Sequence, residues 1–75
     1  MQIGLDAVKV GQQTVVAKLQ LAQTLQERLA SFGVIPGTVL RVRYKSPDLT
    51  VTALEFRGTV VAMRTRDLGG IRVVC

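Results

Sequence analysis

A ten-residue segment, residues 28–37 (RLASFGVIPG), constrains the fold of this chain most strongly. It ends an apolar stripe with helical spacing and leads into β-prone sequence that continues to the last residue. Gly33 fits the position just after a helix, where a left-handed backbone costs glycine no Cβ clash. Pro36 prevents the helix from resuming, and Pro36 with Gly37 suits the centre of a type II turn. The segment therefore predicts one helix that gives way to strands.

The apolar stripe defines the helix. Leu21, Leu25, Leu29 and Phe32 recur at i, i+4, i+8 and i+11, which places them on one helical face. This spacing predicts a helix over about residues 21–32, with these four side chains directed inward. We expect positive φ at Gly33 and Gly37.

Five short strands are predicted around this helix, over residues 14–19, 38–44, 50–56, 59–65 and 71–74. Arg57 and Gly58 would form a two-residue hairpin turn, with positive φ at Gly58. Closing such a sheet into a barrel removes its exposed edges. We therefore expect a single domain over residues 1–75: a mainly β, small five-stranded barrel with one α-helix inserted between strands 1 and 2.

The chain lacks the side chains that most catalysis requires. It has no His, a single Cys at position 75 and five scattered acidic residues. A metal centre needs three or four ligands brought together, and a cysteine nucleophile needs a base. The Gly-rich stretches do not precede a helix, as a phosphate loop would. We expect no enzyme activity, no catalytic residues, no cofactor and no dedicated metal site.

Apolar patterning also limits where the chain can act. It has no run of 18 apolar residues that could span a membrane. The first residues show neither a basic region nor an apolar core of a signal peptide. With one cysteine and no internal disulfide, these features predict a cytoplasmic protein.

A net charge of +5 indicates an acidic partner or surface. Arg41, Arg43 and Lys45 alternate along one predicted strand and should share a face, while Tyr44 should be partly in the core. We expect Arg64, Arg66 and Arg72 to extend this basic surface. The partner-binding candidates are Arg41, Arg43 and Arg64, with the loop at residues 46–49 next. The alternative is a free-standing basic β-barrel that binds nucleic acid, although such proteins usually add aromatic stacking platforms.

Three motifs together resemble FeoA-like proteins. The helix end at Arg28 and Leu29, followed by Phe32-Gly33-Val34-Ile35-Pro36-Gly37, is similar to their Arg-Leu…Leu-Gly-x-x-Pro-Gly signature. Residues 56–64 (FRGTVVAMR) are similar to their Arg-Gly-x-x-(Ile/Val)-Ala-Leu-Arg segment. The opening from Leu5 to Gly11 also fits. Phe32 and Met63 stand where the family commonly has Leu, and both stay apolar. The signature residues in this chain are Leu29, Gly33, Pro36, Gly37, Arg57 and Gly58.

The resemblance implies an SH3-like barrel and a small cytosolic accessory of bacterial ferrous iron transport. It implies a protein-interaction role toward FeoB, the membrane permease with a cytosolic GTP-binding domain, so that the chain would meet the membrane only through this partner. It also leaves room for weak binding of a transition metal ion. The same module resembles the C-terminal domain of iron-dependent repressors, here without a DNA-binding helix-turn-helix.

Overall fold

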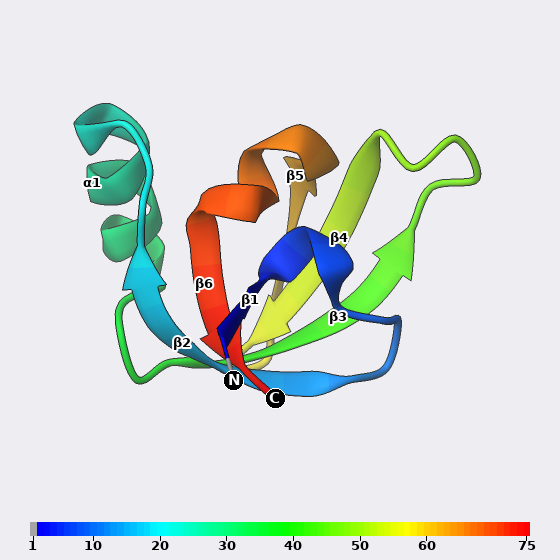
Figure 1. The fold of residues 1–75 in the computed structure, drawn as a ribbon, viewed down its shortest axis with the longest axis horizontal. Helices are drawn as coiled ribbons and strands as arrows, with labels where there is room; N and C mark the ends of the chain where they lie inside the picture. Colours follow the sequence, from blue (N-terminus) through cyan, green and yellow to red (C-terminus); the bar gives the residue numbers. More distant parts are fainter. Residues whose placement is uncertain (1) are drawn as a thin grey trace.

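Nine short elements make up the part of the chain that the structure, a computed structural model, describes. It covers residues 2–75, so Met1 of the predicted 1–75 domain lies outside the described residues. The described chain has six strands and one α-helix. The strands wrap around a small interior, and the α-helix lies to the side (Figure 1). In chain order the elements are β1 (Gln2–Gly4), the 3-10 helix η1 (Leu5–Ala7), β2 (Gln13–Leu19), α1 (Gln23–Phe32), β3 (Val39–Lys45), β4 (Val51–Phe56), β5 (Thr59–Arg64), the 3-10 helix η2 (Thr65–Gly70) and β6 (Ile71–Val74).

All strands join one antiparallel sheet in the order β1-β6-β2-β3-β4-β5. The mainly β fold with a single α-helix is confirmed, but the predicted count of five strands is wrong. The additional strand is β1, which pairs Gln2 with Val74 and Gly4 with Arg72. Three residues are too few to show an alternating pattern, so β1 left no signal in the sequence. The α-helix therefore lies between the second and third strands.

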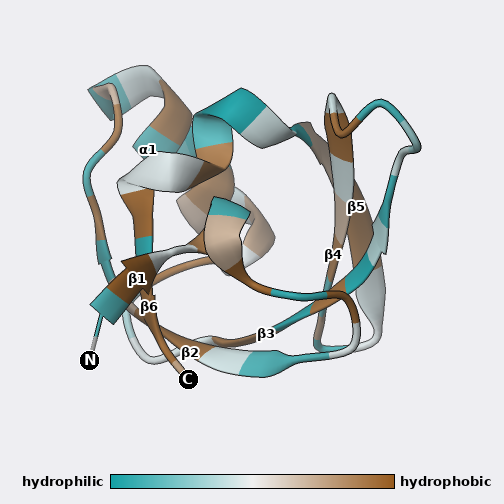
Figure 2. Ribbon diagram, turned by 45° about the vertical axis from the view of Figure 1, so that its right-hand side comes forward, coloured by the Kyte–Doolittle hydropathy of each residue, from teal (hydrophilic) through white to brown (hydrophobic). Residues whose placement is uncertain are grey.

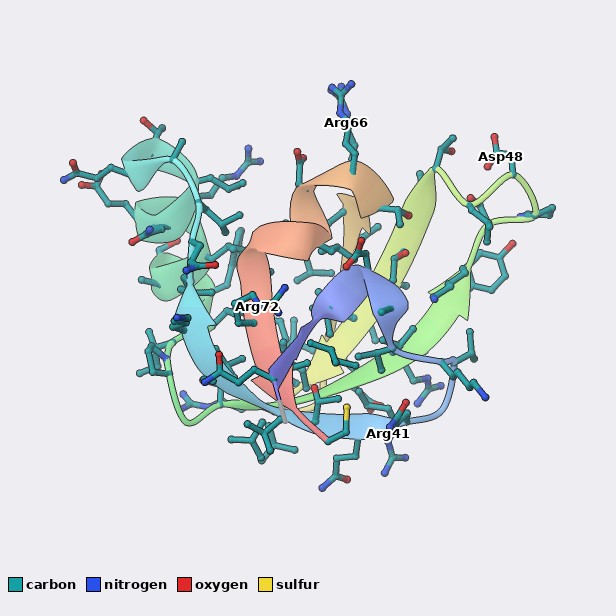
Figure 3. All side chains as sticks on the ribbon, viewed as in Figure 1. Arg41, Asp48, Arg66 and Arg72 are labelled. Carbon is teal, nitrogen blue, oxygen red and sulfur yellow. The ribbon has the colours of Figure 1, made fainter. Side chains whose placement is uncertain are left out.

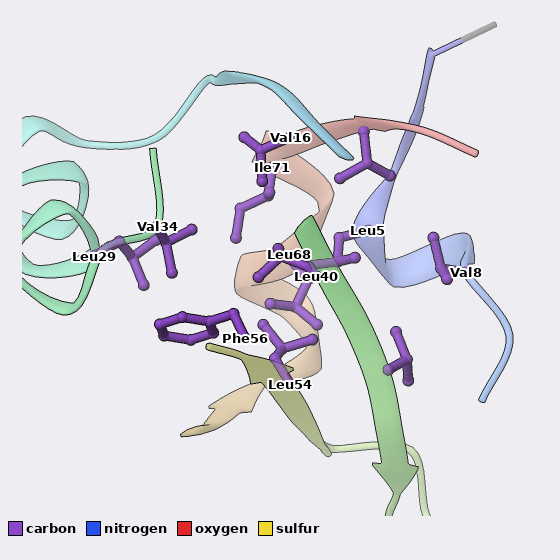
Figure 4. Packing of buried hydrophobic residues seen from close by; sticks show 12 residues of the cluster. Leu5, Val8, Val16, Leu29, Val34, Leu40, Leu54, Phe56, Leu68 and Ile71 are labelled. Atoms are coloured by element: carbon purple, nitrogen blue, oxygen red, sulfur yellow. The ribbon is translucent and has the colours of Figure 1, made fainter. Parts of the chain in front are cut away.

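The core is aliphatic and draws on almost every element. Buried and more exposed residues alternate along β2, the first half of β3 and β4, as expected for a sheet with one buried face. Figure 2 shows hydrophobic and hydrophilic residues interspersed along β3. Figure 4 shows the buried side chains converging from the strands, from α1 and from both 3-10 helices. The buried hydrophobic residues are Leu5, Val8, Val16, Leu29, Val34, Leu40, Val42, Leu54, Phe56, Leu68, Ile71 and Val73.

Helix α1 begins two residues later than predicted and presents its stripe differently. Leu29 is buried, and Leu21 and Leu25 pack partly against the core, as expected. Phe32, predicted to point inward, is 48% exposed. The predicted apolar stripe started at Leu21, but the helix begins at Gln23. Phe32 is the last helical residue. Phe32 lies about 60° around the helix from Leu29, nearly in line with Leu25, and so stands at the edge of the buried stripe.

The helix end at Gly33 and the turn at Gly37 form as predicted. Gly33 has φ of 96°, and the N–H of Val34 donates to the carbonyl of Leu29 over 2.9 Å, which closes the helix. Gly37 has φ of 94° after Pro36. The side chain of Thr38 secures this loop by donating from Oγ1 to the carbonyl of Gly33 over 2.8 Å.

Because β3 contains a bulge, the side chains of its second half point to the opposite side from the one predicted. Val42 pairs with Leu54, but the next pair is Tyr44 with Ala53, so Arg43 is an extra residue. Tyr44 is consequently 55% exposed, and its predicted place in the core is wrong. Lys45, opposite the buried Thr52, turns toward η1, and its Nζ lies 3.5 Å from the carbonyl oxygen of Asp6. Arg41, Arg43 and Lys45 therefore do not share one face.

Candidate functional site

Two of the motifs singled out in the sequence meet at the end of α1. Arg57 and Gly58 form the two-residue turn between β4 and β5, and both have positive φ, 53° and 75°. This is the pattern of a type I′ hairpin turn. The Arg57 side chain reaches back to the helix end, because a Cβ atom on Gly33 would lie 3.4 Å from its Nη1. Leu29, on the inner face of α1, is buried. The signature residues at this end of the helix therefore have structural roles.

The candidate contact residues Arg41 and Arg43 lie on the outer surface of β3. Arg41 donates from Nη2 to Oε1 of Gln13 over 3.1 Å, and Arg43 forms an ion pair with Glu55 at 3.0 Å. Both guanidinium groups therefore already have polar neighbours. A partner would have to compete with these contacts.

Arg64 does not belong to this surface. It pairs with Val51 at the far end of the β4–β5 hairpin, four residues along β4 from Glu55, the pairing partner of Arg41. Figure 3 shows Arg66 and Arg41 at opposite ends of the molecule, with Arg72 between them. The prediction of one continuous basic surface is wrong, because the β3 bulge and the curved sheet spread these side chains apart.

A surface depression that combines apolar and charged groups lies between α1 and β5. It has a volume of about 390 Å³. Its helical wall consists of Leu25, Arg28, Leu29 and Phe32, and its other wall is residues 61–64 of β5, with Asp67 of η2 at one end. We call this depression the α1–β5 groove.

Charge and exposure make the groove suitable for binding another molecule. Two arginines, Arg28 and Arg64, flank it, and Asp67 is the acidic residue that lines it. Phe32 contributes a half-exposed aromatic ring, the kind of side chain that often anchors protein contacts. Of the residues predicted to bind a partner, the groove contains Arg64 alone. Sequence reasoning missed the rest as binding residues, because it assigned Leu25, Leu29 and Phe32 to the interior of the domain.

The acidic and thiol side chains of the described residues are dispersed. Residues 2–75 contain no group of three or more His, Cys, Asp or Glu side chains placed to hold a metal ion. The thiol of Cys75 is exposed.

Hydrogen bonds from the Ser46 hydroxyl and from the backbone and hydroxyl of Thr50 lower the pKa of Asp48. This carboxylate organises the loop at residues 46–49 and does not line the groove.

Over the described residues, none of the helices has the length and apolar content needed to cross a membrane.

The comparison with protein families decides the relationship that the motifs suggested. The family described as FeoA domain matches residues 3–75. The chain belongs to the FeoA family. This family is associated with ferrous iron transport. No curated protein sequence matches this FeoA domain.

Solved structures confirm the fold of the FeoA domain. The FeoA protein from Chlorobium tepidum superposes with a TM-score of 0.90 at 24% identity, over 95% of this chain and 68% of that one. A FeoA-like protein from Clostridium acetobutylicum gives a TM-score of 0.85 at 23% identity, over 97% of this chain and 85% of that one. A manganese-dependent transcriptional repressor gives 0.86 at 22% identity, and the match spans 97% of this chain but 40% of the repressor.

Proposed function

We propose that this FeoA domain is a non-catalytic protein-interaction module that assists ferrous iron transport by binding the cytosolic region of a FeoB-type permease. The observation that carries the proposal is the α1–β5 groove, in which Phe32 is half-exposed and which Arg28 and Arg64 also line. A small barrel with apolar anchors and peripheral charge is equipped for docking. In this proposal the domain acts in the cytoplasm and meets the membrane through its partner.

The chemistry of the described residues supports a non-enzymatic role. Catalysis needs an activated nucleophile, an acid–base pair or a bound metal. The sequence has no His, and the acidic side chains of residues 2–75 do not gather into a ligand set. Any transition metal ion bound to this domain would therefore meet isolated carboxylates and bind weakly.

A pull-down tests the proposal. The immobilised domain should retain the purified cytosolic region of a FeoB-type permease, and a Phe32→Asp variant should retain much less of it. Phe32 is half-exposed, so this change leaves the core intact. Equal retention by beads without the domain would contradict the proposed function.

Nucleic-acid binding remains a second candidate because of one observation. Tyr44 is 55% exposed and follows Arg43 on the outer surface of β3. An exposed aromatic ring beside a guanidinium can stack on a base. Binding of a single-stranded RNA that weakens with added salt and is lost in Tyr44→Ala would support this role. An RNA affinity that is unaffected by Tyr44→Ala would reject it.

A further inference from the structure

The strand β5 forms one end of the sheet, so one of its two edges has no neighbouring strand among the described residues. The turn at Arg57 and Gly58 fixes which backbone groups face this edge. In a two-residue type I′ hairpin the flanking residues, Phe56 and Thr59, form a hydrogen-bonded pair, and such pairs recur at every second residue. Thr59, Val61 and Met63 therefore bond to β4.

The alternate residues of β5 point their N–H and C=O groups away from β4. These are Val60, Ala62 and Arg64. The next bond along the hairpin agrees with this alternation, because the N–H of Thr65 donates to the carbonyl of Thr50 over 2.9 Å. Within residues 2–75, neither the backbone nor the side-chain hydrogen bonds include a bond to these three outward N–H groups.

The α1–β5 groove follows this edge. Four consecutive residues of β5, residues 61–64, line it. Successive side chains of a strand point to opposite faces, so a groove over one face would be lined by alternate residues. Consecutive lining residues mean that the groove runs along the backbone edge itself, with α1 as its other wall.

This edge also lacks the features by which proteins usually protect an exposed strand. Edge strands are commonly short, bulged, or interrupted by proline or lysine. The pairing of β4 with β5 is regular over six residue pairs, whereas the β2–β6 and β3–β4 pairings both contain a bulge. The sequence of β5 is TVVAMR, with its charge at the last position.

We infer that the α1–β5 groove binds an extended acidic segment of a partner protein, which adds as a further strand to the edge of β5. The inference rests on the proposed function, since it names the kind of segment through which the partner docks. Main-chain bonds to Val60, Ala62 and Arg64 would hold a segment of about five residues. Its apolar side chains would contact Phe32 and Leu25, and its acidic side chains would meet Arg28 and Arg64.

Amide hydrogen exchange on the unaltered domain, with and without the purified permease cytosolic region, tests the inference. In the free domain the amides of Val60, Ala62 and Arg64 should exchange rapidly, while those of Val61 and Met63, bonded to β4, are the internal control. Saturating partner should slow the three outward amides at least tenfold. Bound partner without such slowing would overturn the added strand and leave the proposed function standing, whereas the absence of any binding would overturn both.

A backbone variant provides the second test. Ala62→Pro removes one outward N–H and fits the rule that proline is tolerated on the open side of an edge strand. It should weaken partner binding at least tenfold while the circular dichroism spectrum is retained, and unchanged affinity would overturn the inference. If the variant fails to fold, the exchange measurement decides.

The free domain must also be measured at several concentrations. If protection of the three amides increases with the concentration of the domain alone, and the measured mass doubles, the edge binds a second copy of this chain. That result would reject an acidic partner segment.

Discussion

The guanidinium of Arg57 lies against Gly33, so the turn between β4 and β5 contacts the residue that ends α1. The contact joins positions 24 residues apart, and a Cβ atom on Gly33 would come within 3.4 Å of Nη1 of Arg57. A positive charge at a helix C-terminus also interacts favourably with the helix dipole. This contact links the β4–β5 turn to the C-terminal end of α1.

Matched glycine substitutions test this contact. Gly33 and Gly37 have nearly equal φ, 96° and 94°, but the space around Gly37 is open. Gly37→Ala should lose about 1–2 kcal/mol of unfolding free energy through backbone strain alone. Gly33→Ala should lose a similar amount, because its methyl group would lie at an ordinary contact distance of 3.4 Å from Nη1 of Arg57.

The same denaturant-unfolding series in an Arg57→Ala background provides the control. Both glycine variants should lose the same amount there as in the unaltered domain. A Gly33→Ala loss that exceeds that of Gly37→Ala only when the Arg57 side chain is present would contradict the 3.4 Å spacing.

Substitutions on the buried face of helix α1 should lower the unfolding free energy more than substitutions at its exposed positions. Leu29 is 3% exposed, so Leu29→Ala should lower the unfolding free energy by about 2–5 kcal/mol. Phe32→Ala, at a half-exposed position, should cost about 1 kcal/mol or less and still weaken partner binding. Urea denaturation and calorimetry measure the two effects. A Phe32→Ala loss as large as that of Leu29→Ala would place the ring in the core.

The loop at residues 46–49 should respond to acid. Hydrogen bonds, the largest from the Ser46 hydroxyl, lower the pKa of Asp48 below its ordinary value. The folded state therefore favours the carboxylate, and this stabilisation is fully present above the ordinary aspartate pKa of about 4 and is lost as the pH falls through the lower folded value. An NMR titration of the Asp48 carboxyl carbon should give a midpoint below about 4. Ser46→Ala should raise that midpoint, and an unaltered midpoint would contradict the account.

Iron binding by the domain alone should be weak. The sequence lacks His, and residues 2–75 bring no three ligand side chains together. Anaerobic calorimetric titration with Fe(II) should therefore show no one-to-one site in the micromolar range. Cys75→Ser serves as the control for adventitious binding to the exposed thiol. A micromolar site that survives in this variant would refute the expectation.

Local features of the fold could be predicted because short-range chemistry determines them. The helix end at Gly33, the turn at Gly37 and the hairpin turn at Gly58 depend on glycine conformations that neighbouring residues reveal. Strand β1 could not be predicted, because its three residues gain stability from pairing with β6, 70 residues later. The β3 bulge left no signal either, and it reverses the exposure of Tyr44.

Most of the candidate site could not be predicted from the sequence, because it also depends on contacts between distant parts of the chain. The groove forms from residues of α1 and β5 that lie 29 or more positions apart, and nothing local indicates that they face one another. Arg64 was selected for its charge, which placed one groove residue among the candidates. Arg41 and Arg43 follow from strand alternation, and the structure places them on a different surface.

The most direct test of the central claim is a calorimetric titration of the permease cytosolic region with two matched charge-reversal variants. Arg28→Glu with Arg64→Glu alters the groove, whereas Arg41→Glu with Arg43→Glu makes the same change in net charge on the outer surface of β3. We expect the groove variant to weaken binding at least tenfold and the β3 variant to change it less than threefold. Equal weakening by both variants, or loss in the β3 variant alone, would contradict docking through the α1–β5 groove.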